Sequence, residues 1–250
     1  MDSARKTETM SALTDRFLAV LERLARAMPA RATPSGKASP VSVQLVAVSK
    51  WHAAPTLVEL ASFWASLGGA PAFGESYTQE FIEKAPLVHS ALPSPPHWHF
   101  IGHLQSRKAR SVAGQLALIH SLDSLSLAAA LEKHTPPGQV QPVLVQVNIG
   151  REPQKSGVMP EALEPFLLSL KHSPKVLVQG LMAMPPYDPD GEFSRPFFTE
   201  LRSLRDTAEQ HLGQPLPHLS MGMSHDMEVA IQEGATIVRV GTDIFGPREY

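Results

Sequence analysis

Eight short apolar runs follow one another along the chain, and most of the gaps between them carry helical periodicity. The runs cover residues 44–48, 70–73, 98–101, 118–120, 142–147, 176–181, 218–220 and 237–240. Strands that alternate with helices are typical of parallel βαβ units. Eight such units in about 210 residues match the count and size of a (β/α)8 barrel. A doubly wound sheet is the alternative, but it usually has fewer strands, and no G-x-G-x-x-G motif follows the first run.

A further helix is predicted before the first strand, over residues 11–28. Its apolar side chains recur at helical spacing, at Leu13, Phe17, Val20, Leu21 and Leu24. Residues 29–40 are rich in Pro, Ala and Ser, a composition typical of a flexible connection. The sequence therefore predicts an N-terminal helix and connection over residues 1–40, followed by a single α/β TIM-type barrel over residues 41–250.

The composition excludes several classes of chemistry. The 250 residues contain no cysteine, which removes disulfides, thiolate catalysis and cysteine-based metal sites. Lys and Arg total 22 against 24 Asp and Glu, so we expect no binding to nucleic acid or to an anionic membrane. The N-terminus lacks the apolar core of a signal peptide, and no later run could span a membrane. We expect a cytoplasmic protein, a monomer, and no metal site, with His99 as a hydrogen-bonding core histidine.

The first strand ends close to a lysine. Side chains alternate across a strand, so Lys50 shares a face with Val46 and Val48. If these valines point into the barrel, Lys50 points into its mouth, at the end where barrels carry their functional residues. The alternative is a lysine that bends out to solvent.

An arginine, Arg239, interrupts the apolar last strand. Burying a charge without a partner is costly, so Arg239 requires either a carboxylate, with Asp243 or Glu228 as candidates, or a ligand in the barrel mouth. Gly241 and Thr242 follow at once and offer backbone N–H groups and a hydroxyl.

The loop after the seventh strand offers Ser224 near an expected helix start. Helix starts and small-residue loops bind phosphate, and barrels often place a phosphate after strands seven and eight. A lysine, an inward arginine and two such loops together are what pyridoxal 5′-phosphate (PLP) requires.

Six stretches extend this pattern, namely AVSK (47–50), FGESYTQE (73–80), WHFIGHLQSRK (98–108), VQVNIGREPQKSG (145–157), GLMAM (180–184) and the closing block 219–250. From about residue 45 to the end, the chain resembles the pyridoxal phosphate homeostasis proteins, the YggS/PROSC family. That family is similar in fold to the barrel domain of alanine racemase. The resemblance implies that Lys50 holds PLP as a Schiff base, that Ser224, Gly241 and Thr242 contact the phosphate, and that Arg239 faces the pyridine nitrogen.

Two more residues complete the predicted cofactor site. Ser76 stands where the family usually has Asn, which puts in doubt any ring contact that the longer amide would make. Met223 is either packing filler or a pliable wall for the cofactor ring. Arg107 and Gly150 also depart from the family pattern, and we expect them to alter the rim of the site.

The resemblance implies a non-catalytic PLP-binding protein of intracellular PLP homeostasis, with PLP-dependent apo-enzymes as candidate partners. The alternative is a racemase-type enzyme, and weak activity of that kind stays open. Racemisation needs an acid or base on each face of the substrate carbon. In the racemase, a tyrosine from a second domain serves one face. Here the chain ends ten residues after Val240, so we expect no such domain, and Tyr77 is the better internal substitute. An RNA adaptor using Arg107, Lys108 and Arg110 would need a basic face that the composition does not show.

Overall fold

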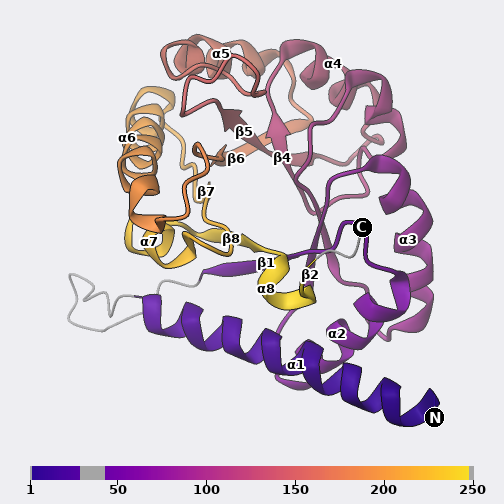
Figure 1. Cartoon of the computed structure of the whole chain (residues 1–250). Coiled ribbons are helices and arrows are strands. Elements are labelled where there is room, and N and C mark those ends of the chain that lie inside the picture. Colours follow the sequence, from indigo (N-terminus) through magenta and orange to yellow (C-terminus); the bar gives the residue numbers. More distant parts are fainter. Residues whose placement is uncertain (1, 29–42, 248–250) are drawn as a thin grey trace, which may run out of the picture.

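The computed structural model describes residues 2–28 and 43–247, and its centre is a closed barrel of eight parallel strands in sequence order (Figure 1). The strands are β1 Gln44–Val48, β2 Ala72–Glu75, β3 His97–Phe100, β4 Leu118–Leu122, β5 Gln141–Val147, β6 Val176–Ala183, β7 His218–Ser220 and β8 Ile237–Val240. The predicted (β/α)8 barrel is therefore confirmed.

Helices cover the outside of the barrel. The α-helices are α1 Asp2–Ala27, α2 Ala54–Ser66, α3 Thr78–Ala91, α4 Leu125–His134, α5 Leu163–Ser169, α6 Arg195–Leu212, α7 Met227–Gln232 and α8 Thr242–Phe245. Short 3-10 helices are η1 Ser106–Ser111, η2 Pro160–Ala162, η3 Leu170–His172 and η4 Gly191–Ser194. A 3-10 helix, η1, connects β3 to β4 where the other early connections use α-helices.

The bounds of β1, β7 and β8 agree with the sequence prediction, whereas β2 lies two residues later. Propensity disfavours Gly74 and Glu75 in a strand, but both pair with β3, opposite His99 and Phe100. The ladder with the neighbouring strand thus overrides the local preference.

The barrel closes through the pairing of its first and last strands. β1 and β8 run parallel, and Val46 lies opposite Arg239 in the register. This closure brings the end of β1, and with it Lys50, beside the end of β8.

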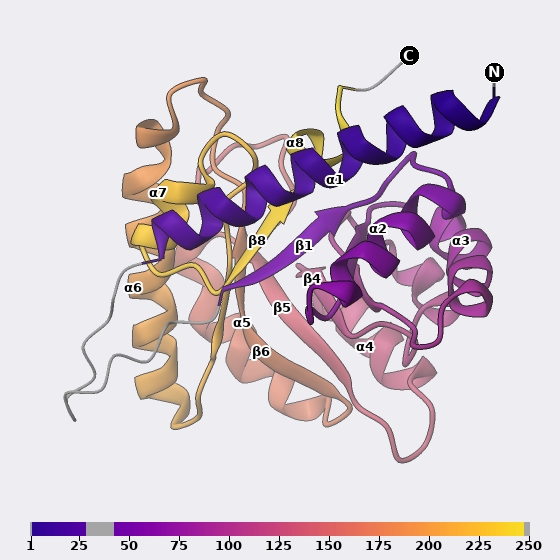
Figure 2. The same ribbon diagram turned by 90° about the horizontal axis from the view of Figure 1, so that it is seen from below.

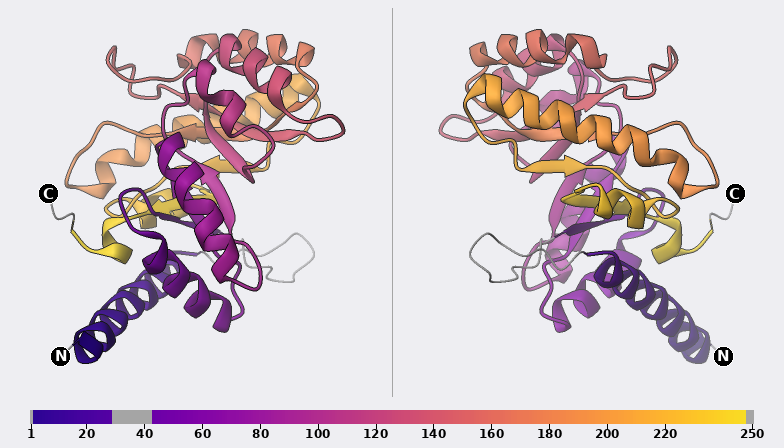
Figure 3. Two further views of the ribbon diagram at one scale, coloured as in Figure 1. Left: turned by 90° about the vertical axis from the view of Figure 1, so that its right-hand side faces the viewer. Right: turned by 90° about the vertical axis from the view of Figure 1, so that its left-hand side faces the viewer.

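Helix α1 lies outside the barrel and packs across α2, α7 and α8 (Figures 2 and 3). Four of the five residues of its predicted apolar face are buried, namely Leu13, Phe17, Val20 and Leu24. The ring of Phe17 packs on Trp64 of α2, with 4.9 Å between the ring centroids. The flexible connection predicted for residues 29–40 lies outside the described residues, and the division of the chain at residue 40 stays a prediction.

None of the helices in the described ranges is long and apolar enough to cross a membrane.

Candidate functional site

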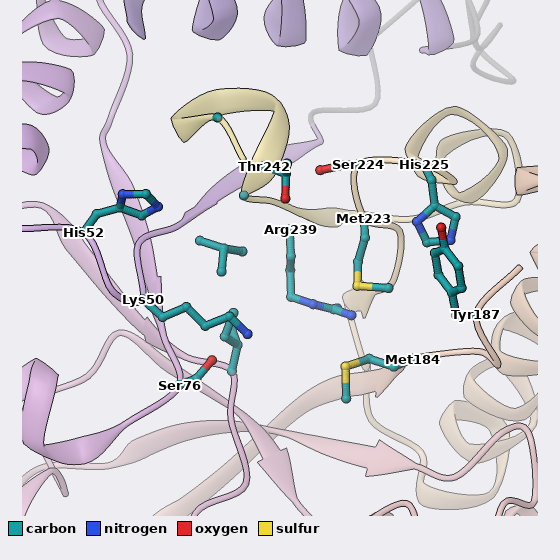
Figure 4. A pocket seen from close by; sticks show the side chains of 14 residues that line it. Lys50, His52, Ser76, Met184, Tyr187, Met223, Ser224, His225, Arg239 and Thr242 are labelled. Atoms are coloured by element: carbon teal, nitrogen blue, oxygen red, sulfur yellow. The ribbon is translucent and has the colours of Figure 1, made fainter. Parts of the chain in front are cut away.

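A cavity of about 510 Å³ opens at the mouth of the barrel, at the carboxyl ends of the strands (Figure 4). Its lining includes all seven residues that the sequence predicts for the cofactor, namely Lys50, Ser76, Met223, Ser224, Arg239, Gly241 and Thr242. Val48 also lines it, as the inward alternation from Val46 requires. Six further residues, outside the predicted cofactor set, complete the lining: His52, Ile101, Met184, Tyr187, His225 and Gly246. Most of these lie in irregular loops, where strand alternation gives no signal.

Lys50 extends from the end of β1 into this cavity (Figure 4). A buried ion cluster holds the backbone on both sides of it. The Lys84 ammonium donates to the Ser49 carbonyl at 2.9 Å, and the Trp51 backbone N–H donates to the Glu80 carboxylate at 2.8 Å. Trp51 adopts a left-handed conformation with φ +68°, which is uncommon for a bulky residue. The cluster therefore supports a strained turn that aims Lys50 inward.

Two carboxylates complete this cluster. Lys84 contacts Glu75 at 2.8 Å and Glu80 at 2.9 Å, and the Ser49 hydroxyl donates to Glu75 at 2.7 Å. Glu75 is fully buried, and its burial raises the pKa of its carboxyl group. The sequence analysis did not single out Glu75, Glu80 or Lys84 as charges that position Lys50, because their pairing depends on how α3 docks on the barrel.

Arg239 is buried, and no ion pair joins it to a carboxylate within the described ranges. The two predicted alternatives for a partner, Glu228 and Asp243, instead pair with Arg23 of α1. Arg239 donates to the Ser220 hydroxyl at 2.6 Å and to the Ala183 carbonyl at 3.1 Å. Burial lowers its pKa to about 10, so the guanidinium stays charged at neutral pH. The structure thus favours the ligand-facing interpretation over the structural ion pair.

Behind Arg239, a chain of polar side chains crosses the barrel interior. The Ser220 hydroxyl lies 2.8 Å from Nδ1 of His120, and Nε2 of His120 lies 2.9 Å from Nδ1 of His99. Gln44 closes the chain, 3.4 Å from Nε2 of His99. Burial lowers the pKa of His99 to about 3 and that of His120 well below its usual range. Both histidines are therefore neutral and leave Arg239 as the cation of this chain, and the expectation of His99 as a hydrogen-bonding core histidine is confirmed.

The two predicted phosphate loops lie side by side at one edge of the cavity (Figure 4). Buried Asp226 shapes the first loop by accepting from the Met223 backbone N–H at 2.7 Å and from the Ser194 hydroxyl at 2.9 Å. Helices α7 and α8 begin after these loops and have only six and four residues. Anion binding here would therefore use loop N–H groups and the hydroxyls of Ser224 and Thr242.

A second cavity of about 640 Å³ adjoins the first. Six residues line both cavities, namely Lys50, Ser76, Ile101, Met184, Tyr187 and Met223. The second one also contains Tyr77, Gln146, Lys108 and Lys155. Lys50 therefore lies where the two cavities adjoin. Across the described parts of the chain, no group of three or more His, Asp or Glu residues could hold a metal ion.

Comparisons with known proteins place these features in context. The family model of the alanine racemase N-terminal domain matches residues 11–249. A pyridoxal phosphate homeostasis protein of Aquifex aeolicus is 47% identical over 184 residues, which cover 73% of this chain and 79% of the relative. One from Pseudomonas aeruginosa is 38% identical over 243 residues, or 96% and 98% of the two chains.

Solved structures of two proteins are also similar to this chain. PipY of Synechococcus elongatus, with PLP bound, has a TM-score of 0.74 and 31% identity, and the match covers 94% of this chain and 100% of PipY. Alanine racemase of Corynebacterium glutamicum has a TM-score of 0.64 and 18% identity, and the match covers 82% of this chain and 57% of the racemase. The second likeness shows a shared fold only.

Proposed function

Because this chain belongs to the family of pyridoxal phosphate homeostasis proteins, which contain the alanine racemase N-terminal domain, we propose that it binds PLP and takes part in PLP homeostasis. One observation carries the proposal. Arg239, a buried cation without an ion pair among the described residues, lines the same cavity as Lys50. A charge in that position fits an electron-rich ligand, and about 510 Å³ is within the usual range of small-molecule sites.

The positions of the lining residues support a role for each of them. PLP supplies an aldehyde that reacts with primary amines, and Lys50 presents such an amine. Ser224, Gly241 and Thr242 would hold the phosphate group, because loop N–H groups and hydroxyls at this edge can donate to its oxygens. Arg239 would face the pyridine nitrogen.

We propose a carrier rather than an enzyme. Two cations facing each other are unfavourable, so Arg239 disfavours a proton on the ring nitrogen, and an unprotonated ring is a weaker electron sink. The candidate second acid or base, Tyr77, lines the adjoining cavity, but this residue is 47% exposed and its ring stacks on Trp51 at 6.0 Å between centroids. Apo-enzymes that depend on PLP are the proposed recipients of the cofactor.

The first test is covalent attachment at Lys50. Purified protein mixed with PLP should develop a visible absorption band, and borohydride followed by peptide mapping should place the cofactor on Lys50. Lys50→Ala should abolish the band, whereas Lys108→Ala and Lys155→Ala, in the adjoining cavity, should retain it. Attachment at Lys108 or Lys155 in the wild-type protein would overturn the assignment.

The second test separates carrier from racemase. In deuterated buffer, the PLP-loaded protein should not exchange the α-proton of L-alanine at an enzyme-like rate, because the candidate second acid or base, Tyr77, is 47% exposed and stacks on Trp51. NMR measures the exchange directly. Rapid exchange that disappears in Tyr77→Phe would refute the carrier proposal and establish the racemase.

A further inference from the structure

Arg23 lies on α1, outside the barrel, yet it binds both loops of the proposed phosphate site. Its Nε donates to Glu228 at 2.6 Å, and its Nη2 donates to the other oxygen of Glu228 at 3.1 Å. Nη1 pairs with Asp243, and Nη2 also donates to the Ser224 carbonyl at 2.8 Å. One side chain thus joins segments more than 200 positions apart in the sequence.

The partners of Arg23 adjoin the residues proposed to hold the phosphate. Asp243 directly follows Thr242, and Glu228 is in the first turn of the helix that follows Ser224. The hydrogen bond from Arg23 lowers the pKa of Glu228, so this carboxylate is ionised at neutral pH. A negative charge so close to a phosphate would oppose its binding unless a cation compensates it.

We propose that Arg23 is a positioning residue that sets the affinity of the site for phosphate by neutralising Glu228 and Asp243 and fixing the Ser224 carbonyl. The inference rests on the proposed function and adds to it a role for α1. Without Arg23, two uncompensated carboxylates would lie beside the residues proposed to hold the phosphate, and the two segments that carry them would lose their shared hydrogen-bond donor.

The rest of α1 is held independently of Arg23. Phe17 and Val20 are buried, and Arg16 donates to the Ile244 carbonyl at 2.9 Å. Replacing Arg23 should therefore leave α1 docked and change mainly the charge beside the loops. This separation makes the role measurable.

The experiment measures dissociation constants for PLP and for pyridoxal, which has the same ring and aldehyde but no phosphate. Arg23→Gln should weaken PLP binding at least about tenfold and leave pyridoxal binding within about twofold of wild type. Arg23→Lys keeps the charge and should stay within about threefold. Lys133→Gln is the control, because it removes one exposed positive charge of α4, whereas Arg26 of α1 also acts on the charge of Glu228.

A rescue variant distinguishes an effect of charge on PLP binding from an effect of packing. Adding Glu228→Gln and Asp243→Asn to Arg23→Gln removes all three charges and should restore PLP binding to within about threefold of wild type. This variant and Arg23→Lys also decide the case if Arg23→Gln alone does not fold. Equal losses for PLP and pyridoxal, or no rescue, would overturn the inference while the proposed function stands. Wild-type protein that does not bind PLP would overturn both.

Discussion

At the scale of single residues, the site depends on charges that meet only in the folded chain. Lys84 is 8% exposed and contacts Glu75, Glu80 and the Ser49 carbonyl. It compensates a fully buried carboxylate and at the same time fixes the backbone before Lys50. The stability of the fold and the placement of the Lys50 amine therefore depend on the same side chain.

Replacing Lys84 by Met should destabilise the protein by about 3–5 kcal/mol, because Glu75 would stay buried without its cation. Urea denaturation measures this loss, and PLP binding should weaken with it. Lys133→Met, at an exposed lysine of α4, is the control and should change stability by less than about 0.5 kcal/mol. An equally small change in the stability of Lys84→Met would contradict the stabilising role of the ion cluster.

At the scale of elements, the loop between β7 and α7 depends on one backbone conformation. Gly222 has φ +91°, and a Cβ there would lie 2.6 Å from the Cβ of Ala230. Its carbonyl accepts from the Arg239 backbone N–H at 3.0 Å. A close approach of α7 to the strand end thus places Met223 and Ser224 at the cavity.

Gly222→Ala should therefore cost more stability than the strain of a left-handed residue alone, which is about 1–2 kcal/mol, and it should weaken PLP binding. Gly213→Ala is a matched control, because Gly213 has φ +66° at the end of α6 and open space around its missing Cβ. That variant should show the strain without loss of binding. Thermal denaturation and PLP titration compare the stability and the PLP affinity of the two variants. Equal losses in both variants would show that the contact between Gly222 and α7 is unimportant.

At the scale of the whole molecule, neutral histidines inside the barrel join strands from opposite sides. His99 of β3 and His120 of β4 connect Gln44 of β1 to Ser220 of β7 and Arg239 of β8. Other groups that disfavour a proton here are His97 and His218, together with Arg239 itself. The barrel therefore folds with both histidines deprotonated.

This burial predicts a pH dependence of stability. The pKa of His99 falls to about 3 and that of His120 falls well below its usual range, so the unfolded chain binds protons below about pH 6.5 that the folded protein does not. The stabilisation is present above that pH and is lost as the pH falls, by about 1.4 kcal/mol per pH unit for each histidine. The free energy of unfolding, measured by urea denaturation between pH 6 and pH 5, should fall less steeply with falling pH in His120→Asn than in wild type. The same pH dependence of the unfolding free energy in both proteins would contradict the prediction.

The sequence by itself determined the barrel, the bounds of β1, β7 and β8, and seven of the residues that line the cavity. These follow from periodicity and alternation, which are local properties of a strand or helix. It left open whether Arg239 pairs with Asp243 or Glu228 or faces a ligand. Only the tertiary structure showed that neither carboxylate pairs with Arg239, because the docking of α1 brings Arg23 to both of them, while the closure of β8 on β1 places Arg239 at the cavity. Ion pairs form between groups that are close in space, and the pattern of residues along the chain does not specify which groups these are.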